Sequence, residues 1–280
     1  MLKSLGGGAF FGEVWGPGDP EVLALHGWGR THGDFAGVVG PASPGGPLAT
    51  LAPDLPGFGA TPAPPGAWGA ADYAAALVPL LTDLGDGGGG RPMVVLGHSR
   101  GGCIAVTLAA LRPDLVRALV ITGAPLVPRP GPRLKPAAPY RMARRLHRWG
   151  LVSEGRMEKA RQRHGSTDYR AASGIMREVF VRMVNENYSD RLAELRCPVE
   201  FVWGDDDAEV PVAVARAAAS IVTGSLAPRA AAPTNGADSV GAPSSETGAT
   251  VTLCPGAGHL TPLTAPGELR AAVERALAGR

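Results

Sequence analysis

The chain has 280 residues, of which 45 % are apolar and 19 % are charged, so it can bury a large core. Its net charge of +2 is too small to indicate a nucleic-acid partner. No stretch approaches the ~20 consecutive apolar residues that a membrane span needs, and Met1–Gly8 lacks the apolar run of a signal peptide. The three cysteines are scattered and match no disulfide or metal spacing. We therefore expect a cytoplasmic protein in a reducing compartment.

Short apolar runs bounded by glycine and proline recur along the chain and predict buried strands. In chain order they are Ala9–Val14, Val22–Leu25, Pro47–Ala52, Met93–Leu96, Ala118–Thr122, Val199–Trp203 and Thr250–Cys254. Helical patterns alternate with these strands, at Asp72–Leu84, Gly102–Leu111, Pro211–Val222 and Glu268–Leu277. The alternation predicts an α/β fold with a mostly parallel central sheet and helices on both of its faces.

Two segments depart from this alternation of strands and helices. Residues 126–196 carry helical patterns and no convincing strand, which predicts an inserted helical cap between core segments 1–125 and 197–280. Residues 224–250 are rich in Ala, Pro, Gly, Ser and Thr, with almost no large apolar residue. A packed element cannot be built from that composition, so we expect a flexible loop within the core.

A candidate nucleophile lies where a strand passes into a helix. Gly97-His98-Ser99-Arg100-Gly101 fits the pattern G-x-S-x-G, which is weak by itself in a chain with 40 glycines. Its context is more specific, because the motif follows the strand at Met93–Leu96 and opens the next helix, as a nucleophile elbow requires. Glycines two residues on either side relieve the crowding of that turn. We therefore expect Ser99 to be held at the carboxyl edge of the sheet.

A serine hydroxyl needs a base to take its proton and an acid to orient that base. Three histidines follow Ser99, and two of them, His147 and His164, fall in the expected cap. His259 instead follows a strand on the glycine-rich loop Gly256-Ala257-Gly258, where it could reach the serine. The loop after Trp203 offers four carboxylates as the acid, which are Asp205, Asp206, Asp207 and Glu209.

Taken together, these motifs resemble the α/β-hydrolase fold superfamily over most of the chain, in its serine-nucleophile, esterase-like branch. Around the elbow the resemblance rests on His26-Gly27-Trp28-Gly29, Asp54-Leu55-Pro56-Gly57-Phe58-Gly59 and Arg112-Pro113-Asp114-Leu115-Val116. Phe201 to Pro211 is similar to the family's strand followed by G-x-x-D-x-x-x-P, and Pro255 to Leu260 resembles its P-x-x-G-H loop. The resemblance implies that Asp207 is the acid, with Asp206 as the runner-up, and that His259 is the base. The separation between acid and histidine is about twice the usual one, which we attribute to the 224–250 segment.

The same resemblance implies an oxyanion hole made by the backbone N–H groups of Trp28 and Arg100. For His26 and His98, which are near these groups in sequence, packing and loop hydrogen bonding are the favoured roles. The implied activity is hydrolysis of a carboxylic ester or related acyl compound through an acyl-enzyme on Ser99, with no metal or organic cofactor. The same triad could act on a carbon–carbon, amide or thioester bond, catalyse acyl transfer or act as a haloperoxidase. A ligand-binding protein with an idle triad is a further alternative.

The expected cap differs in charge from the rest of the chain. It holds 16 Lys and Arg against seven Asp and Glu, whereas the remaining residues hold 11 basic and 18 acidic ones. Arg141, Arg144, Arg145 and Arg148 share one helical face, while Met142, Leu146 and Trp149 lie on another. This pattern indicates either attraction of an anionic substrate or acidic surface, or a solvated basic face, which we favour. A second apolar helix surface, at 175–184, indicates either that this helix docks the cap onto the core or that part of it lines an acyl pocket, and the two roles are compatible. The oligomeric state is left open.

Overall fold

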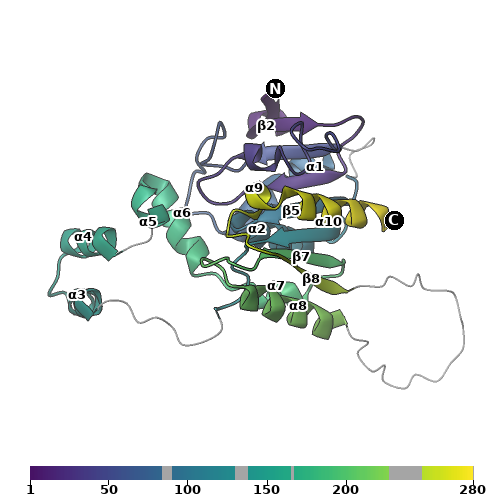
Figure 1. Cartoon of the computed structure of the whole chain (residues 1–280). Coiled ribbons are helices and arrows are strands. Elements are labelled where there is room, and N and C mark those ends of the chain that lie inside the picture. Colours follow the sequence, from purple (N-terminus) through teal and green to yellow (C-terminus); the bar gives the residue numbers. More distant parts are fainter. Residues whose placement is uncertain (84–89, 130–137, 165–166, 227–247, 280) are drawn as a thin grey trace, which may run out of the picture.

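The computed structural model describes residues 1–83, 90–129, 138–164, 167–226 and 248–279, and within these ranges the side chains of 138–140, 160–162, 164 and 225–226 are not described. Its centre is an eight-stranded sheet in the order β1-β2-β4-β3-β5-β6-β7-β8 (Figure 1). The strands are β1 (Lys3–Leu5), β2 (Phe10–Trp15), β3 (Val22–Leu25), β4 (Thr50–Asp54), β5 (Met93–His98), β6 (Val116–Thr122), β7 (Val199–Gly204) and β8 (Ala249–Cys254). Strands β3 to β8 run parallel, while β2 is antiparallel to both β1 and β4.

Helices cover both faces of the sheet because the strand side chains alternate between two apolar layers. Leu23 and Leu25 belong to the layer that contains α1 (Ala70–Thr82), α2 (Arg100–Leu111) and α8 (Val212–Leu226). Val22 and Ala24 belong to the opposite layer, which α10 (Pro266–Ala278) and the short helix η2 (His32–Phe35) complete. The predicted fold class is therefore confirmed.

Several element boundaries differ from the prediction. The strand expected at 47–52 is β4, which extends through Asp54 because it pairs with β2 along its whole length. The helix expected at 72–84 begins at Ala70, since the Asp72 carboxylate accepts the backbone N–H of Gly69 at 2.9 Å and caps the first turn. Helix α2 begins at Arg100, directly after Ser99. Strand β1 and two short helices, η1 (Gly6–Gly8) and α9 (Thr261–Thr264), were not predicted.

The segment expected to form the cap contains five helices and, among its described residues, no strand. They are α3 (Ala138–Arg148), α4 (Glu154–His164), α5 (Thr167–Ala171), α6 (Gly174–Val184) and α7 (Ser189–Ala193). Helix α7 packs against α2 and α8, and Leu192 is part of the main core. Helix α6 contributes Val179 and Met183 to the same core. Helices α3 and α4 pack on each other and lie away from the sheet (Figure 1).

The loop expected at 224–250 falls mostly outside the described residues. Helix α8 continues to Leu226 and β8 begins at Ala249, so the ends of that segment belong to regular elements, and residues 227–247 are not described. Throughout the described ranges, no helix has the combination of length and apolar character required to cross a bilayer.

Candidate active site

Ser99 occupies a sharp turn between β5 and α2. Its backbone has φ 51° and ψ −118°, and it is the one non-glycine residue with positive φ in the described part of the chain. Such a conformation is costly for a residue with a Cβ and persists only when its surroundings enforce it. Here the Ser99 N–H donates to the carbonyl of Thr122 at 2.9 Å, and the Ser99 carbonyl accepts the N–H of Gly102 at 3.0 Å.

Steric constraints explain why glycine occupies the positions two residues before and two residues after Ser99. A Cβ at Gly97 would lie 2.6 Å from the Cα of Gly102, within the first turn of α2. A Cβ at Gly101 would overlap the backbone carbonyl of Leu25 in β3. Both obstacles are backbone atoms that cannot move aside independently, so a larger residue at either position would strain the turn.

His259 connects the serine to a carboxylate. Its Nε2 lies 3.2 Å from the Ser99 Oγ, and its Nδ1 lies 2.9 Å from the Oδ2 of Asp207. Because the carboxylate offers only acceptor oxygens, Nδ1 donates to it and Nε2 is left to accept from the serine hydroxyl. The three residues come from the ends of β5, β7 and β8, which meet at one edge of the parallel sheet.

Asp207 is buried, with 4 % of its surface exposed, and both of its oxygens are used. Oδ1 accepts the backbone N–H groups of Glu209 at 2.9 Å and Val210 at 2.8 Å, which leaves Oδ2 directed at the imidazole. Asp206, the runner-up for the acid, is exposed. Asp205 is also exposed, and it accepts the N–H of Gly256 at 2.7 Å, which ties the acid loop to the histidine loop.

Glu209 is a charged neighbour of His259 whose closeness the sequence did not indicate. Its carboxylate lies 3.7 Å from Nε2, and its side chain is 71 % exposed. Burial disfavours the imidazolium form of His259, but the hydrogen bond and charge of Asp207, together with Glu209 and Asp168, outweigh it and raise the pKa of His259. These surroundings therefore stabilise the protonated form of His259.

The Gly27–Trp28 peptide lies beside the serine. A Cβ at Gly27 would be 3.3 Å from the Cβ of Ser99, so the backbone of this loop lies close to that serine. Within the described chain, no hydrogen bond uses the backbone N–H of Trp28 or of Arg100. Arg100 is the first residue of α2, where N–H groups have no intrahelical acceptor. Neither N–H group therefore has an acceptor among the described residues.

His26 and His98 are buried hydrogen-bonding residues. His26 Nδ1 donates to the carbonyl of Gly27 at 2.8 Å, while its Nε2 accepts the N–H of Leu55 at 2.8 Å, so it joins two loops. His98 Nε2 donates to the backbone carbonyl of His259 at 3.0 Å and so steadies the histidine loop. Burial lowers the pKa of each to about 4, which keeps both neutral.

The other two histidines after Ser99 lie on α3 and α4. His147, on α3, contacts the carbonyl of Val152 at 2.8 Å and the carboxylate of Glu154 at 3.0 Å. The side chain of His164, at the end of α4, is outside those described.

Aromatic side chains connect helix α6 to the loop that carries Trp28. The ring of Trp28 lies 4.9 Å from that of Phe58 and 5.0 Å from that of Phe180, measured between centroids. The Arg100 side chain donates to the carbonyl of Met183 at 3.1 Å, which ties the start of α2 to α6. The Phe58 and Phe180 contacts were not predicted, although Phe58 lies within the D-x-P-G-x-G turn.

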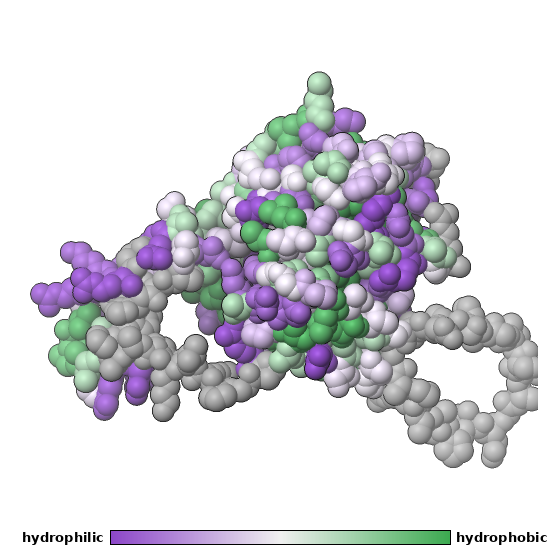
Figure 2. All heavy atoms as spheres, viewed as in Figure 1, coloured by the Kyte–Doolittle hydropathy of each residue, from purple (hydrophilic) through white to green (hydrophobic). Residues whose placement is uncertain are grey.

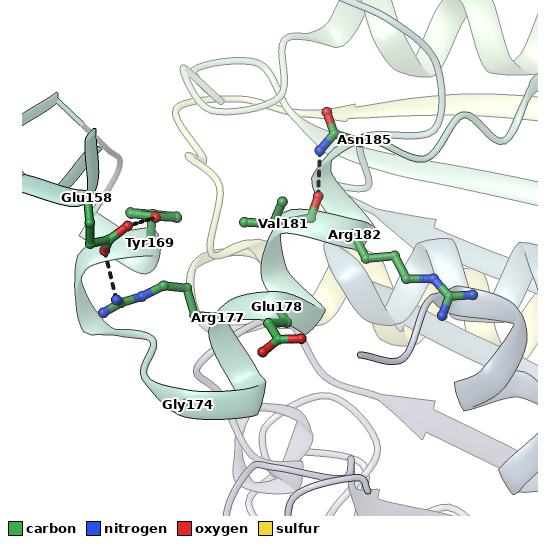
Figure 3. A pocket seen from close by; sticks show the side chains of 8 residues that line it. All are labelled: Glu158, Tyr169, Gly174, Arg177, Glu178, Val181, Arg182 and Asn185. Carbon is green, nitrogen blue, oxygen red and sulfur yellow. Dashed lines mark hydrogen bonds and ion pairs between the residues drawn. The ribbon is translucent and has the colours of Figure 1, made fainter. Parts of the chain in front are cut away.

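A hollow of about 650 Å³ is lined mostly by residues of α6 (Figure 3). Its lining includes Tyr169, Arg177 and Arg182 and no member of the Ser99 site. Arg177 pairs there with Glu158 at 2.8 Å. Among the described residues, no group of three or more His, Cys, Asp or Glu side chains could hold a metal ion.

An eight-stranded, mostly parallel sheet with a serine elbow at its carboxyl edge defines an α/β-type hydrolase architecture. The pattern of the alpha/beta hydrolase family matches residues 22–272, and the chain belongs to that family. It is 35 % identical over 183 residues to the lipase LipV of Mycobacterium tuberculosis, covering 65 % of this chain and 66 % of that protein. It is also 41 % identical over 117 residues to a pimeloyl-[acyl-carrier protein] methyl ester esterase of Chromobacterium violaceum, covering 40 % of this chain and 39 % of that one.

The chain thus spans two thirds or less of these curated relatives. Among solved structures, a thermophilic esterase from Thermogutta terrifontis superimposes with a TM-score of 0.64, at 21 % identity, covering 99 % of this chain and 98 % of that one. That likeness supports the fold.

Proposed function

We propose that the protein hydrolyses carboxylic esters through an acyl-enzyme formed on Ser99. The observation that carries the proposal is the continuous contact from Ser99 Oγ to His259 Nε2 at 3.2 Å and from His259 Nδ1 to Asp207 Oδ2 at 2.9 Å. This contact joins a strained serine to a buried carboxylate. The names of the two curated relatives, a lipase and a methyl ester esterase, favour an ester over other acyl bonds.

In the first step, His259 Nε2 takes the proton of Ser99 while Oγ attacks the ester carbonyl carbon. The carbonyl oxygen becomes negatively charged and is held by the N–H groups of Trp28 and Arg100, each donor contributing about 3 kcal/mol to the transition state. The imidazolium then gives its proton to the departing alcohol, and the acyl group stays on Oγ. Asp207 keeps His259 in the tautomer and orientation that both transfers need.

In the second step, water takes the place of the alcohol. His259 removes a proton from it as it attacks the acyl carbon, and the proton returns to Ser99 as the free acid leaves. The raised pKa of His259 suits this cycle, because the imidazolium is an intermediate in each half of the reaction.

We infer that residues 126–196 act as a cap and that α6 forms one wall of the acyl-binding region. Phe180 on α6 packs on Trp28, next to the oxyanion loop, and Met176 contacts Gly57 in the neighbouring turn. These side chains are apolar and include a flexible thioether, which suits acyl chains of variable shape. The three cysteines, Cys103, Cys197 and Cys254, are free and buried, which supports the reducing, cytoplasmic compartment that we propose.

The proposal is tested by labelling with a fluorophosphonate probe, which modifies activated serines. The wild-type protein should be labelled and Ser99→Ala should not, whereas Ser220→Ala, an exposed serine on α8, should label like wild type. Equal labelling of Ser99→Ala would show that another residue is the nucleophile.

A panel of matched p-nitrophenyl esters, thioesters and anilides then compares the acyl bonds, with peroxide added to detect haloperoxidase activity. Esters should give the highest kcat/KM. A higher value for any other class would replace the ester in this proposal.

A further inference from the structure

Helix α3 carries a row of positive charges on its surface. Arg141, Arg144 and Arg148 are exposed, and Arg145 shares their side of the helix. None of the four forms an ion pair with an acidic side chain in the described residues. Together they line most of an open hollow of about 690 Å³, whose other described lining residues are Met142 and His147. A concave surface with this charge favours anionic groups, since positive charges around a hollow reinforce one another.

Apolar side chains lie directly beside this basic row. Met142 is 58 % exposed, Trp149 is 54 % exposed and Leu151 is 68 % exposed, although large apolar residues are usually covered. Figure 2 shows apolar side chains at the outer end of the α3–α4 pair, with hydrophilic ones on both sides of them. These apolar residues lie far from the sheet (Figure 1), so they are not part of the main core.

The end of α3 holds these apolar residues on one side. Gly150 adopts φ 74°, which turns the chain back, and the Leu151 N–H donates to the carbonyl of Leu146 at 2.9 Å. This turn places Leu151 next to the last apolar row of the helix. The Arg145 guanidinium lies 4.6 Å from the centre of the Trp149 ring, so the basic and apolar rows are in contact at this point.

We propose that α3 and the turn after it dock the protein on an anionic lipid surface. Arginines that flank an exposed Trp, Met and Leu match what such a surface offers, with phosphates for the guanidinium groups and acyl chains for the apolar side chains. The long arginine stems reach the headgroup layer while their helix lies deeper. An acidic protein face would satisfy the charges but would not require the exposed Trp149 and Leu151. The interaction is a surface contact and is independent of whether Ser99 hydrolyses esters.

The test measures co-sedimentation of the full chain with vesicles of equal parts phosphatidylglycerol and phosphatidylcholine, and with phosphatidylcholine alone. Binding is expected to the anionic vesicles only and should weaken with added salt. Arg144→Gln with Arg148→Gln should weaken it about 30-fold, because each cation near such a surface strengthens binding about fivefold. The charge-matched control, Arg196→Gln with Arg216→Gln, alters exposed arginines elsewhere and should bind like wild type.

Trp149 supplies an independent readout. Its fluorescence should shift to the blue on anionic vesicles, and Trp149→Phe should abolish that shift. Hydrolysis of p-nitrophenyl acetate and fluorophosphonate labelling in the absence of vesicles should be the same in the wild-type and Arg144→Gln/Arg148→Gln proteins. Absence of vesicle binding, equal binding to both vesicle types, or equal weakening by the control pair would overturn the proposal.

Discussion

Asp207→Asn should nearly abolish hydrolysis while preserving the fold. The amide that replaces the carboxylate has one acceptor oxygen and one NH₂ donor. In the native site, Oδ1 accepts two backbone N–H groups, from Glu209 at 2.9 Å and from Val210 at 2.8 Å. An amide turned with its NH₂ toward these donors would leave both unpaired, at about 1–3 kcal/mol each. The asparagine oxygen should therefore remain there, with its NH₂ facing His259.

In this orientation the asparagine NH₂ faces His259 Nδ1, which donates to the carboxylate in the native site. Nδ1 must then accept, and the imidazole hydrogen moves to Nε2, where it faces the Ser99 Oγ. A base already protonated at that atom cannot take the serine proton, and we expect kcat to fall about 10⁴-fold. That loss corresponds to about 5 kcal/mol of transition-state stabilisation.

The assay is kcat on a p-nitrophenyl ester, with thermal unfolding monitored in parallel. Asp206→Asn is the matched control, because it changes an exposed carboxylate in the same loop and should alter kcat by no more than about twofold. If Asp207→Asn lost less than tenfold in kcat, or if Asp206→Asn lost as much as Asp207→Asn, the assignment of the acid would be wrong.

Three further changes probe the surroundings of the triad. Burial disfavours the imidazolium of His259, but nearby carboxylates outweigh the effect of burial on its pKa. Glu209→Gln should therefore lower the pKa of His259 and move the acidic limb of the kcat/KM–pH profile to lower pH. An unchanged acidic limb would contradict this. Gly97→Ala should lower the melting temperature by several degrees, because its Cβ meets backbone at 2.6 Å and overpacking costs about 1–3 kcal/mol, whereas Gly155→Ala meets nothing within 4 Å and should not. Phe180→Ala should raise KM more for octanoyl than for acetyl esters; equal changes would remove it from the acyl wall.

The sequence by itself determined the elements whose causes are local. Apolar runs that alternate along the chain with helical patterns were sufficient to predict the parallel sheet, because the residues of each strand by themselves indicate that both of its faces are buried. Ser99 was predictable for the same reason. Its turn needs glycine at 97 and 101 for steric reasons, and these residues are adjacent to it in the chain. His259 followed from its place on a glycine-rich loop after a strand.

Only the tertiary structure decided which groups meet. Four carboxylates follow β7, and only the resemblance to the family pattern singled out Asp207; their own place in the loop did not distinguish them, since the distinction depends on which one the turn directs inward. In the structure, two backbone N–H groups fix one oxygen of Asp207 and direct the other at His259, which is 52 residues away. The closeness of Glu209 to His259 and the packing of Phe180 on Trp28 depend likewise on how separate elements assemble. Such contacts leave no local signal, because each partner's own neighbours in the chain are compatible with many other arrangements.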